Sequence, residues 1–285
     1  GAATAGAEPK SLARGFQFTS EDRAYWAFQP VRRPPLPKLQ DDSRVRNGID
    51  VFVQHRLEQA GKGLGAPASR RTLLRRLGLD LLGLPPTPVE QAGFLADEAP
   101  GAWQRLIERL LANAHYGERW GRHWLDAAGY ADSEGISNSD PERKWAWRYR
   151  DWVIDAHNAD LPWDRFLVEQ LAGDELVKPP YKDLPLPQID LLIASGFLRN
   201  APDGTGNANS SANRNRVVAE TIKIVSTSIL GLTVGCAQCH NHRYDPIPQA
   251  DYYRLRAILE PALNVTQWKQ PAKRLVSLYT DDDKT

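Results

Sequence analysis

The sequence predicts a mainly α-helical protein, and three observations support that fold class. Apolar residues recur at the three- and four-residue spacing of one helix face, most clearly at Trp103, Leu106, Ile107, Leu110 and Leu111. Strand-type alternation of apolar and polar residues is scarce. Proline pairs and Gly-rich runs separate the periodic segments, as expected at helix ends and in loops. We therefore expect an irregular helical domain with long loops and no internal repeat.

Residues 1–47 are predicted to form an extended strap. Proline favours extended backbone over helix, and this segment contains Pro30, Pro34, Pro35 and Pro37. We expect the strap to lie on the surface of the main body, anchored by Trp26 and Phe28. Residues 48–285 are predicted to form the helical domain.

Helices are expected throughout that domain. In chain order they cover residues 49–60, a segment carrying Leu73 to Leu81, a segment that starts at the capping box Thr87-Pro88-Val89-Glu90, a segment carrying Trp103 to Leu111, residues 116–130, 143–158 and 161–172, a segment carrying Val218 to Ile229, and residues 249–259. The Pro-rich residues 174–188 and the Gly-, Asn- and Ser-rich residues 201–215 are predicted to be loops, the second on the surface.

Composition narrows the function classes. The chain has 36 basic and 35 acidic side chains in 285 residues, a formal net charge of +1, so no nucleic-acid partner is expected. No run approaches the roughly 18 apolar residues of a membrane-spanning helix. The sequence begins without an initiator Met, and we expect it to be a mature or excised segment.

The strongest functional signal is the run Cys236-Ala237-Gln238-Cys239-His240, which holds the only two cysteines of the chain. C-x-x-C-H is the attachment pattern of c-type haem. Two thiols at this spacing can form thioethers to the haem vinyl groups, and His240 can bind the iron as the proximal ligand. The alternatives are zinc bound by Cys236, Cys239 and His242, a thioredoxin-like redox pair, and a simple disulfide. The five-residue pattern favours haem.

Runs of residues on both sides of the motif match one known family. They are Leu230–Cys236, His240–Ile247, Asp251–Tyr253 and, upstream, Trp26–Val31, Leu82–Pro88, Tyr116–Trp120, His123–Asp126, Tyr130–Ser133, Trp147–Ile154 and Gln170–Asp174. Together they resemble the planctomycete-type cytochrome c family, whose members are large secreted or periplasmic proteins. The resemblance implies one covalent haem c and neighbouring cytochrome-like domains in a larger polypeptide, but no demonstrated reaction.

The ligand on the opposite face of the iron is predicted to be His123. The chain contains no Met, so the His/Met pair of many cytochromes c cannot form within it. On a helix, His123 shares a face with Trp120 and Ala127, which offers an aromatic ring and free space. His115 is the alternative, whereas His242 lies too close to His240 in sequence to cross the haem and is expected to be a supporting or propionate-side group. We expect a low-spin haem with two histidine ligands.

Two further groups of residues are candidates around the haem. Arg243 is expected to pair with a propionate, because guanidinium binds carboxylate bidentately. Tyr244, Tyr252 and Tyr253 are expected to supply nearby aromatic surface. An acidic loop offers oxygen ligands of the kind calcium prefers, although helix capping is the favoured explanation: Asp132, Glu134, Asp140 and Glu142. Seven of the nine tryptophans lie between Trp103 and Trp163, and an aromatic core is favoured over a haem pocket for them.

The sequence leaves three function classes open. Electron transfer with a redox partner protein is favoured. A haem enzyme of the peroxidase or small-molecule redox type needs an open distal position and is the first alternative. A structural or assembly module stabilised by its haem is the second. Covalent haem attachment is completed outside the cytoplasm, so a periplasmic or cell-surface location is expected.

Overall fold

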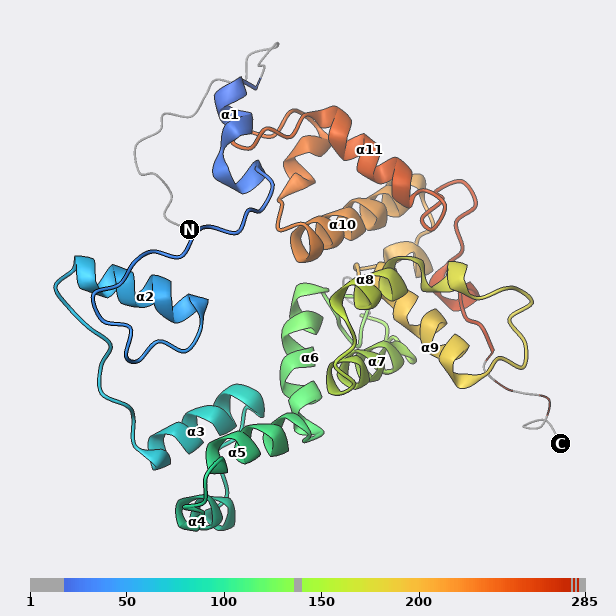
Figure 1. The fold of residues 1–285 in the computed structure, drawn as a ribbon. Coiled ribbons are helices and arrows are strands. Elements are labelled where there is room, and N and C mark those ends of the chain that lie inside the picture. The colour runs from blue at the N-terminus through green and yellow to red at the C-terminus, as the bar shows by residue number, and fades with distance from the viewer. Residues whose placement is uncertain (1–17, 136–139, 278, 280, 282–285) are drawn as a thin grey trace.

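The computed structural model describes residues 18–135, 140–277, 279 and 281. In these residues eleven α-helices and several short 3-10 helices follow one another, and none of the residues described forms a β-strand (Figure 1). The α-helices are α1 (Ser20–Ala24), α2 (Gly48–Gln59), α3 (Arg70–Leu81), α4 (Pro88–Ala96), α5 (Ala102–Leu111), α6 (His115–Ala127), α7 (Ala146–Asn158), α8 (Trp163–Ala172), α9 (Leu186–Ala194), α10 (Ser211–Ile229) and α11 (Gln249–Leu259). The predicted mainly α class is confirmed. Over the same described range, no helix combines the length and the apolar character needed to cross a membrane.

The capping box that the sequence predicts at Thr87 is confirmed, whereas the helix capping expected from the acidic loop is wrong for Asp140, because α7 begins at Ala146 with Trp145 as its N-cap. Thr87 accepts a hydrogen bond from the Glu90 backbone and Glu90 bonds back to Thr87, with Pro88 in the first turn of α4. These contacts satisfy backbone N–H groups that the helix itself leaves unpaired. A second capping box, formed by Asn47 and Asp50, starts α2 and was not predicted.

The predicted surface loop over residues 201–215 is wrong at both ends, although residues 207–210 are irregular and exposed as expected. Ala201, Asp203 and Thr205 are buried, and α10 already begins at Ser211, where the Ser210 side chain caps it. Residues 186–188 of the other predicted loop belong to α9. In both places the polar or Pro-rich composition is typical of a loop. The segment is nevertheless ordered, because partners that lie far away in the sequence hold it.

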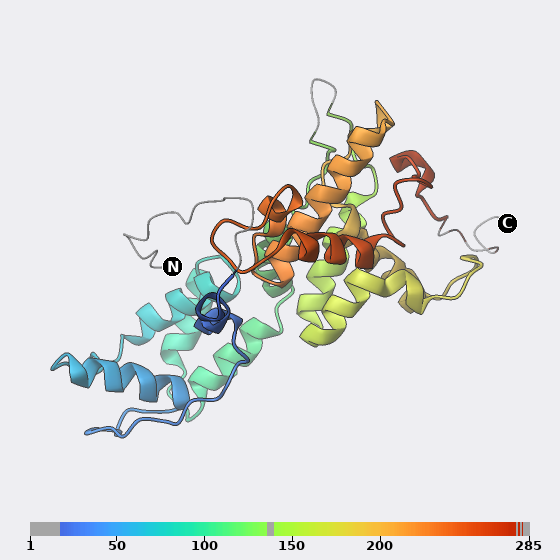
Figure 2. The ribbon, with the colours of Figure 1, turned by 90° about the horizontal axis from the view of Figure 1, so that it is seen from above.

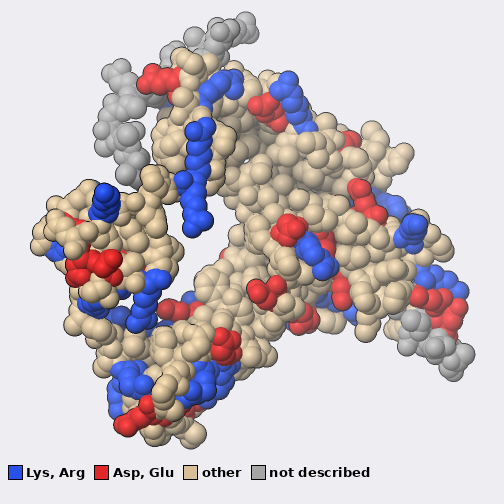
Figure 3. Space-filling view, viewed as in Figure 1, with Lys and Arg blue, Asp and Glu red and all other residues tan. Residues whose placement is uncertain are grey.

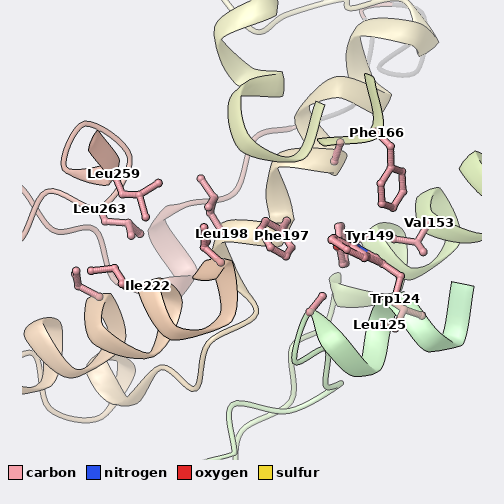
Figure 4. Packing of buried hydrophobic residues seen from close by; sticks show 14 of the residues in the cluster. Trp124, Leu125, Tyr149, Val153, Phe166, Phe197, Leu198, Ile222, Leu259 and Leu263 are labelled. Atoms are coloured by element: carbon pink, nitrogen blue, oxygen red, sulfur yellow. The ribbon is translucent and has the colours of Figure 1, made fainter. Parts of the chain in front are cut away.

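Two buried clusters hold the helices together. The smaller one lies between α3, α4 and α5, and its buried members are Leu74, Phe94, Ala102, Leu106 and Leu110. The larger one joins α6, α7, α8, α10 and α11. Figure 4 shows it as two groups of side chains, one around Trp124 and one around Ile222, with Phe197 and Leu198 between them. These two residues belong to the 3-10 helix η4 (Ser195–Arg199), which therefore links the two halves of the core.

Trp124 is the centre of a buried polar and aromatic network. Its indole N–H lies 3.0 Å from the Tyr149 hydroxyl and 2.8 Å from Gln170 Oε1. The Tyr149 hydroxyl also donates to Gln170 Oε1 at 2.6 Å, and burial raises the pKa of this tyrosine. The Trp124 ring stacks on Phe197 and contacts Phe166 edge-on. The aromatic core predicted for the tryptophans is thus present, although several others, such as Trp145, are exposed.

Helices α6 and α7 approach each other most closely at Gly117. A Cβ atom there would lie 2.3 Å from the Ile154 carbonyl oxygen and 2.7 Å from Asn158 Cγ. The Gly117 N–H donates to Asn158 Oδ1 at 2.8 Å. Only glycine lets the two backbones meet at this distance.

We expect Gly117→Ala to lower the free energy of unfolding by about 1–3 kcal/mol, because the added methyl group forces α6 and α7 apart. Gly93→Ala is the matched control, since nothing lies within 4 Å of a Cβ at that position in α4. The control should stabilise the protein by about 0.4–1 kcal/mol. Urea unfolding of both variants measures the difference, and equal midpoints would contradict the predicted close approach.

The N-terminal arm, residues 18–68, packs differently from the rest. None of its apolar side chains is buried, and Trp26 is 76% exposed, so the expected anchoring by Trp26 is wrong. Glu58 of α2 accepts hydrogen bonds from the Gln40 and Asp41 backbone, which ties the extended residues before α2 to that helix. Figure 3 shows an open gap between α2 and the helical body, with Lys and Arg side chains projecting into it. Residues 1–17 of the predicted strap lie outside the described residues.

The C-terminal segment, residues 264–277, is held on the body by buried polar contacts. The Trp268 indole N–H donates to Thr205 Oγ1 at 3.0 Å, and Gln270 Nε2 donates to the Thr205 carbonyl at 2.9 Å. Arg274 Nη1 lies 2.6 Å from Asp203 Oδ2 in a largely buried ion pair. Burial, and next the charge of Arg274, lower the pKa of the nearby Arg199 to about 10.

Candidate functional site

The C-x-x-C-H run lies in the connection between α10 and α11, beside α1 (Figures 1 and 2). Helix α10 ends at Ile229, and Gly231 takes a left-handed conformation with φ of 64°. This conformation is open to glycine without strain. It turns the chain so that the Leu232 N–H donates back to the Ser226 carbonyl at 3.0 Å, and the chain then enters the 3-10 helix η6 (Val234–Gln238).

Helix η6 and Cys239, the residue that caps its C-terminal end, present the two thiols to solvent. Val234 and Ala237 are 5% and 0% exposed and belong to the larger core cluster. A 3-10 helix has three residues per turn, so these two side chains lie on one side of it. Cys236 and Cys239 have the same spacing on another side, and both are exposed free thiols. The buried pair therefore fixes the direction in which the thiols point.

His240 has one ring nitrogen engaged and one available. The ring is exposed, and its Nδ1 lies 2.7 Å from the Asn241 carbonyl oxygen. A carbonyl only accepts, so Nδ1 carries the proton and Nε2 keeps its lone pair. This is the arrangement in which a neutral histidine binds a metal through Nε2 while its other nitrogen is held by the backbone.

His242 is a buried residue that closes the next loop. Its Nδ1 accepts from the backbone N–H groups of Tyr244, at 3.3 Å, and Asp245, at 2.9 Å. Because Nδ1 is an acceptor, the nearby Asp245 carboxylate does not form an ion pair with a charged ring, although the two groups are only 3.4 Å apart. The other nitrogen, Nε2, lies 3.4 Å from Thr233 Oγ1. His242 thus supports the motif by tying its two flanks together.

We expect His242→Ala to lower the free energy of unfolding by about 1–3 kcal/mol, because partly buried N–H groups lose their acceptor. His240→Ala is the matched control two residues away. Its ring is exposed and its loss should change stability by less than about 0.5 kcal/mol in the protein without cofactor. Chemical unfolding measures both variants. A larger loss for His240→Ala would contradict the roles assigned to the two rings.

Helix α11 holds the motif from the other side through Gln249, which the sequence did not identify as part of the site, and Tyr253, which was expected there only as aromatic surface. The Gln238 carbonyl accepts from Gln249 Nε2 and from the Tyr253 hydroxyl, each at 3.1 Å. Asn241 Oδ1 accepts from the Gln249 backbone N–H at 2.9 Å. The partners are 8 to 15 residues apart, and the sequence pattern does not mark these hydrogen bonds.

Arg243 and Tyr244 lie directly after the motif and both are exposed. The Arg243 guanidinium carbon is 5.5 Å from the centroid of the Tyr244 ring. Neither side chain is buried by the protein, which leaves both accessible to a group attached at the cysteines. Their predicted contacts with a cofactor stay a prediction.

The two candidate distal histidines lie on α6. His123 is exposed and meets Trp120 edge-on with ring centroids 5.5 Å apart, so the predicted shared face is confirmed. His115 Nδ1 lies 2.7 Å from Glu118 Oε2 in an exposed pair at the start of the helix. The ring contacts of both histidines are made within α6, and the His115 backbone N–H donates to Asn113 just before that helix. The structure does not bring either of them into contact with the motif, and iron ligation by either one stays a prediction.

The other metal hypotheses find less support. Within the residues that the structure describes, no three His, Cys, Asp or Glu side chains are grouped to hold a metal ion. Zinc binding by His242 competes with the backbone contacts described above. In the acidic loop, Glu134 pairs with Arg143 at 2.8 Å, and Asp140 accepts from the Gly135 N–H at 2.8 Å. Residues 136–139 of that loop lie outside the described part.

A mainly helical protein that presents a C-x-x-C-H turn on its surface is cytochrome-like in class. The chain belongs to the PSCyt2 family, described as a protein of unknown function (DUF1549), whose family model matches residues 48–263. The predicted family resemblance is confirmed by this match. Searches of curated proteins and of solved structures found no match.

Proposed function

We propose that this protein carries one haem c, attached covalently through Cys236 and Cys239 and ligated by His240. The observation that supports it best is the η6 turn, where two free exposed thiols stand on one side and Val234 and Ala237 are buried on the other. When bound, haem supplies one-electron exchange at its iron. No other pair of thiols exists in the chain.

The protein's own residues prepare this site in three ways. Val234 and Ala237 hold the turn against the core, so the thiols keep their outward direction. The Asn241 carbonyl fixes the tautomer of His240 and leaves Nε2 free for iron. Arg243 and Tyr244, exposed at the rim, are placed to contact the propionates and the ring, as proposed from the sequence.

Electron transfer with a redox partner protein is the function that this geometry supports best. An attachment turn on the surface leaves the cofactor accessible to another protein, and electron transfer needs only such an approach. A haem enzyme is the second candidate. The positions of His123 and His115 favour it, because the ring contacts of both histidines lie within α6 and not at the motif. The sixth coordination position of the iron would then be open to a substrate.

The test is to express the chain in a host that attaches haem c and to examine the denatured protein. We expect one haem per chain in the intact mass, and a pyridine haemochrome spectrum that survives denaturation. A chain with the mass of the bare polypeptide would overturn the proposal. Carbon monoxide then separates the two functions, because a closed six-coordinate iron leaves the spectrum unchanged and an open distal position shifts it.

We expect His123→Ala to convert the low-spin spectrum of the haem-loaded protein to a high-spin one, because the sixth ligand is removed. His115→Ala is the matched control on the same helix and should keep the low-spin bands. Optical and electron paramagnetic resonance spectra measure both variants. If His115→Ala gave high-spin bands and His123→Ala kept low-spin bands, His115 would be the distal ligand. If neither variant changed the spectrum, neither histidine of α6 would bind the iron.

The same proposal includes an exported location and a larger assembly. Covalent haem attachment outside the cytoplasm favours the periplasm or cell surface. Further cytochrome domains or a separate redox protein are the proposed partners. The near-neutral net charge of +1 gives no reason to expect nucleic acid among them.

A further inference from the structure

Four aromatic side chains of the readily oxidised types, tryptophan and tyrosine, form a continuous row through the body of the protein. Trp163 of α8 lies at one end and is 56% exposed. Its ring meets the buried Trp124 ring edge-on, with centroids 5.4 Å apart. The Trp124 indole N–H lies 3.0 Å from the Tyr149 hydroxyl, and the centroid of the Tyr149 ring is 6.4 Å from that of the partly buried Tyr130. Rings in direct contact have centroids about 4.5–7 Å apart, so each member of the row touches the next.

The two buried members of the row are hydrogen-bonded to a neutral amide. The Trp124 N–H and the Tyr149 hydroxyl both donate to Gln170 Oε1, at 2.8 Å and 2.6 Å. An amide oxygen accepts a hydrogen bond but does not take up a proton at neutral pH. An electron can pass through these two rings, but a positive charge left on either of them would stay uncompensated in the core.

Tyr130, at the other end of the row, is hydrogen-bonded to a base. Its hydroxyl donates to Asp132 Oδ1 at 2.5 Å. Burial, and next this hydrogen bond, raise the pKa of Tyr130, so the phenol keeps its proton at neutral pH. A tyrosine that loses an electron becomes a strong acid, and a carboxylate within hydrogen-bonding distance can take its proton directly. Tyr130 is therefore the tyrosine of the row that can become a neutral radical.

We propose that these four rings form a one-electron relay between the exposed Trp163 and the Tyr130–Asp132 pair. A small oxidising radical takes one electron from Trp163, and an electron from Tyr130 replaces it through the two buried rings. The Tyr130 O–H bond breaks, a carboxylic O–H bond forms on Asp132, and a neutral tyrosyl radical remains. A one-electron reductant such as ascorbate then returns the electron, and Asp132 returns the proton. The relay goes beyond the proposed haem attachment and does not depend on it.

The test is pulse radiolysis of the full chain with azide radicals, which oxidise exposed tryptophans by one electron. The variant Cys236→Ser, Cys239→Ser is the background for every measurement, because exposed thiols trap radicals and an attached haem would absorb strongly. We expect the absorption of tryptophan radicals to decay while that of a tyrosyl radical rises, at a rate that does not depend on protein concentration. Tyr130→Phe should lose this phase, whereas Tyr181→Phe, a control outside the row, should keep it.

A double-mutant comparison assigns the phase to the relay. Two other pairs in contact, Trp26 with Tyr25 and Trp120 with Tyr116, can give a similar signal. The relay phase is the part that Trp163→Phe and Tyr130→Phe each remove, and the double variant should lose no more than either single variant. Phenylalanine keeps an aromatic ring at both positions, and circular dichroism checks that the variants remain folded.

The role of the carboxylate is tested by Asp132→Asn. Asparagine keeps a hydrogen-bond acceptor beside Tyr130 but cannot take its proton, so the tyrosyl radical should form more slowly and in lower yield. Asp126→Asn, on the exposed side of α6, is the matched control and should leave the phase unchanged.

Three results would overturn the relay. The first is a tyrosyl phase that persists in full in Tyr130→Phe. The second is a rate proportional to protein concentration, since the electron would then move between molecules. The third is an additive loss in the double variant, which would place Trp163 and Tyr130 in separate pairs. Unchanged kinetics in Asp132→Asn would overturn the role of Asp132 as the proton acceptor.

Discussion

The double variant Cys236→Ser, Cys239→Ser is expected to retain no haem after extraction with acidified acetone, whereas the wild type retains one per chain. Serine oxygens do not form the thioether bonds, and no other cysteine is present. Each single variant should keep haem through its one remaining bond. Intact mass measured after extraction gives the result directly, and haem retained by the double variant would contradict the attachment site.

The same double variant also tests whether the cysteines have a structural role. Both thiols are exposed and unpaired, so the haem-free double variant should unfold within about 0.5 kcal/mol of the haem-free wild type. A larger loss would indicate that one thiol contributes to the fold itself.

Trp124→Ala is expected to lower the free energy of unfolding by about 3–5 kcal/mol, the largest effect of any single substitution considered. The indole is 7% exposed and packs on Phe197 and Phe166, and its removal also takes a donor from Tyr149 and Gln170. Urea unfolding followed by circular dichroism measures the loss.

The control for this prediction is Trp120→Ala, one helical turn earlier on α6. Trp120 is 39% exposed, and it makes aromatic contacts with Tyr116 and His123. Its loss should cost less than about 1 kcal/mol. If the two variants were equally destabilised, the core would not be centred on Trp124.

Local patterns in the sequence were sufficient for most helices. The capping box at Thr87 identifies α4 and the periodic residues Trp103 to Leu111 identify α5, because each signal lies within a few residues. The loop predicted over residues 201–215 failed for the opposite reason. Asp203 and Thr205 are buried against Trp268 and Arg274, which are more than sixty residues away, and no local pattern contains that information.

In the candidate site, too, local signals could be read from the sequence and contacts with other elements could not. The C-x-x-C-H run identifies the two thiols and His240 without any structure. It does not show that Val234 and Ala237 face the core, nor that Gln249 and Tyr253 hold Gln238 from α11. Those contacts depend on how α10 and α11 pack against each other, so they could not be predicted from the sequence. The supporting role of His242 could be predicted in part. A residue two positions after His240 lies too close to it to reach the opposite face of a haem.

The contacts of the C-terminal segment show that the folded unit is longer than the family boundary. The family model ends at residue 263, and every α-helix of the described chain lies before that point. A fragment cut there keeps all the helices, but Thr205 and Asp203 lose Trp268, Gln270 and Arg274 as partners. Buried polar groups would then face a void or invading water. A fragment that ends at the family boundary therefore lacks the buried polar contacts of residues 264–277, whereas a fragment that extends through residue 277 keeps them.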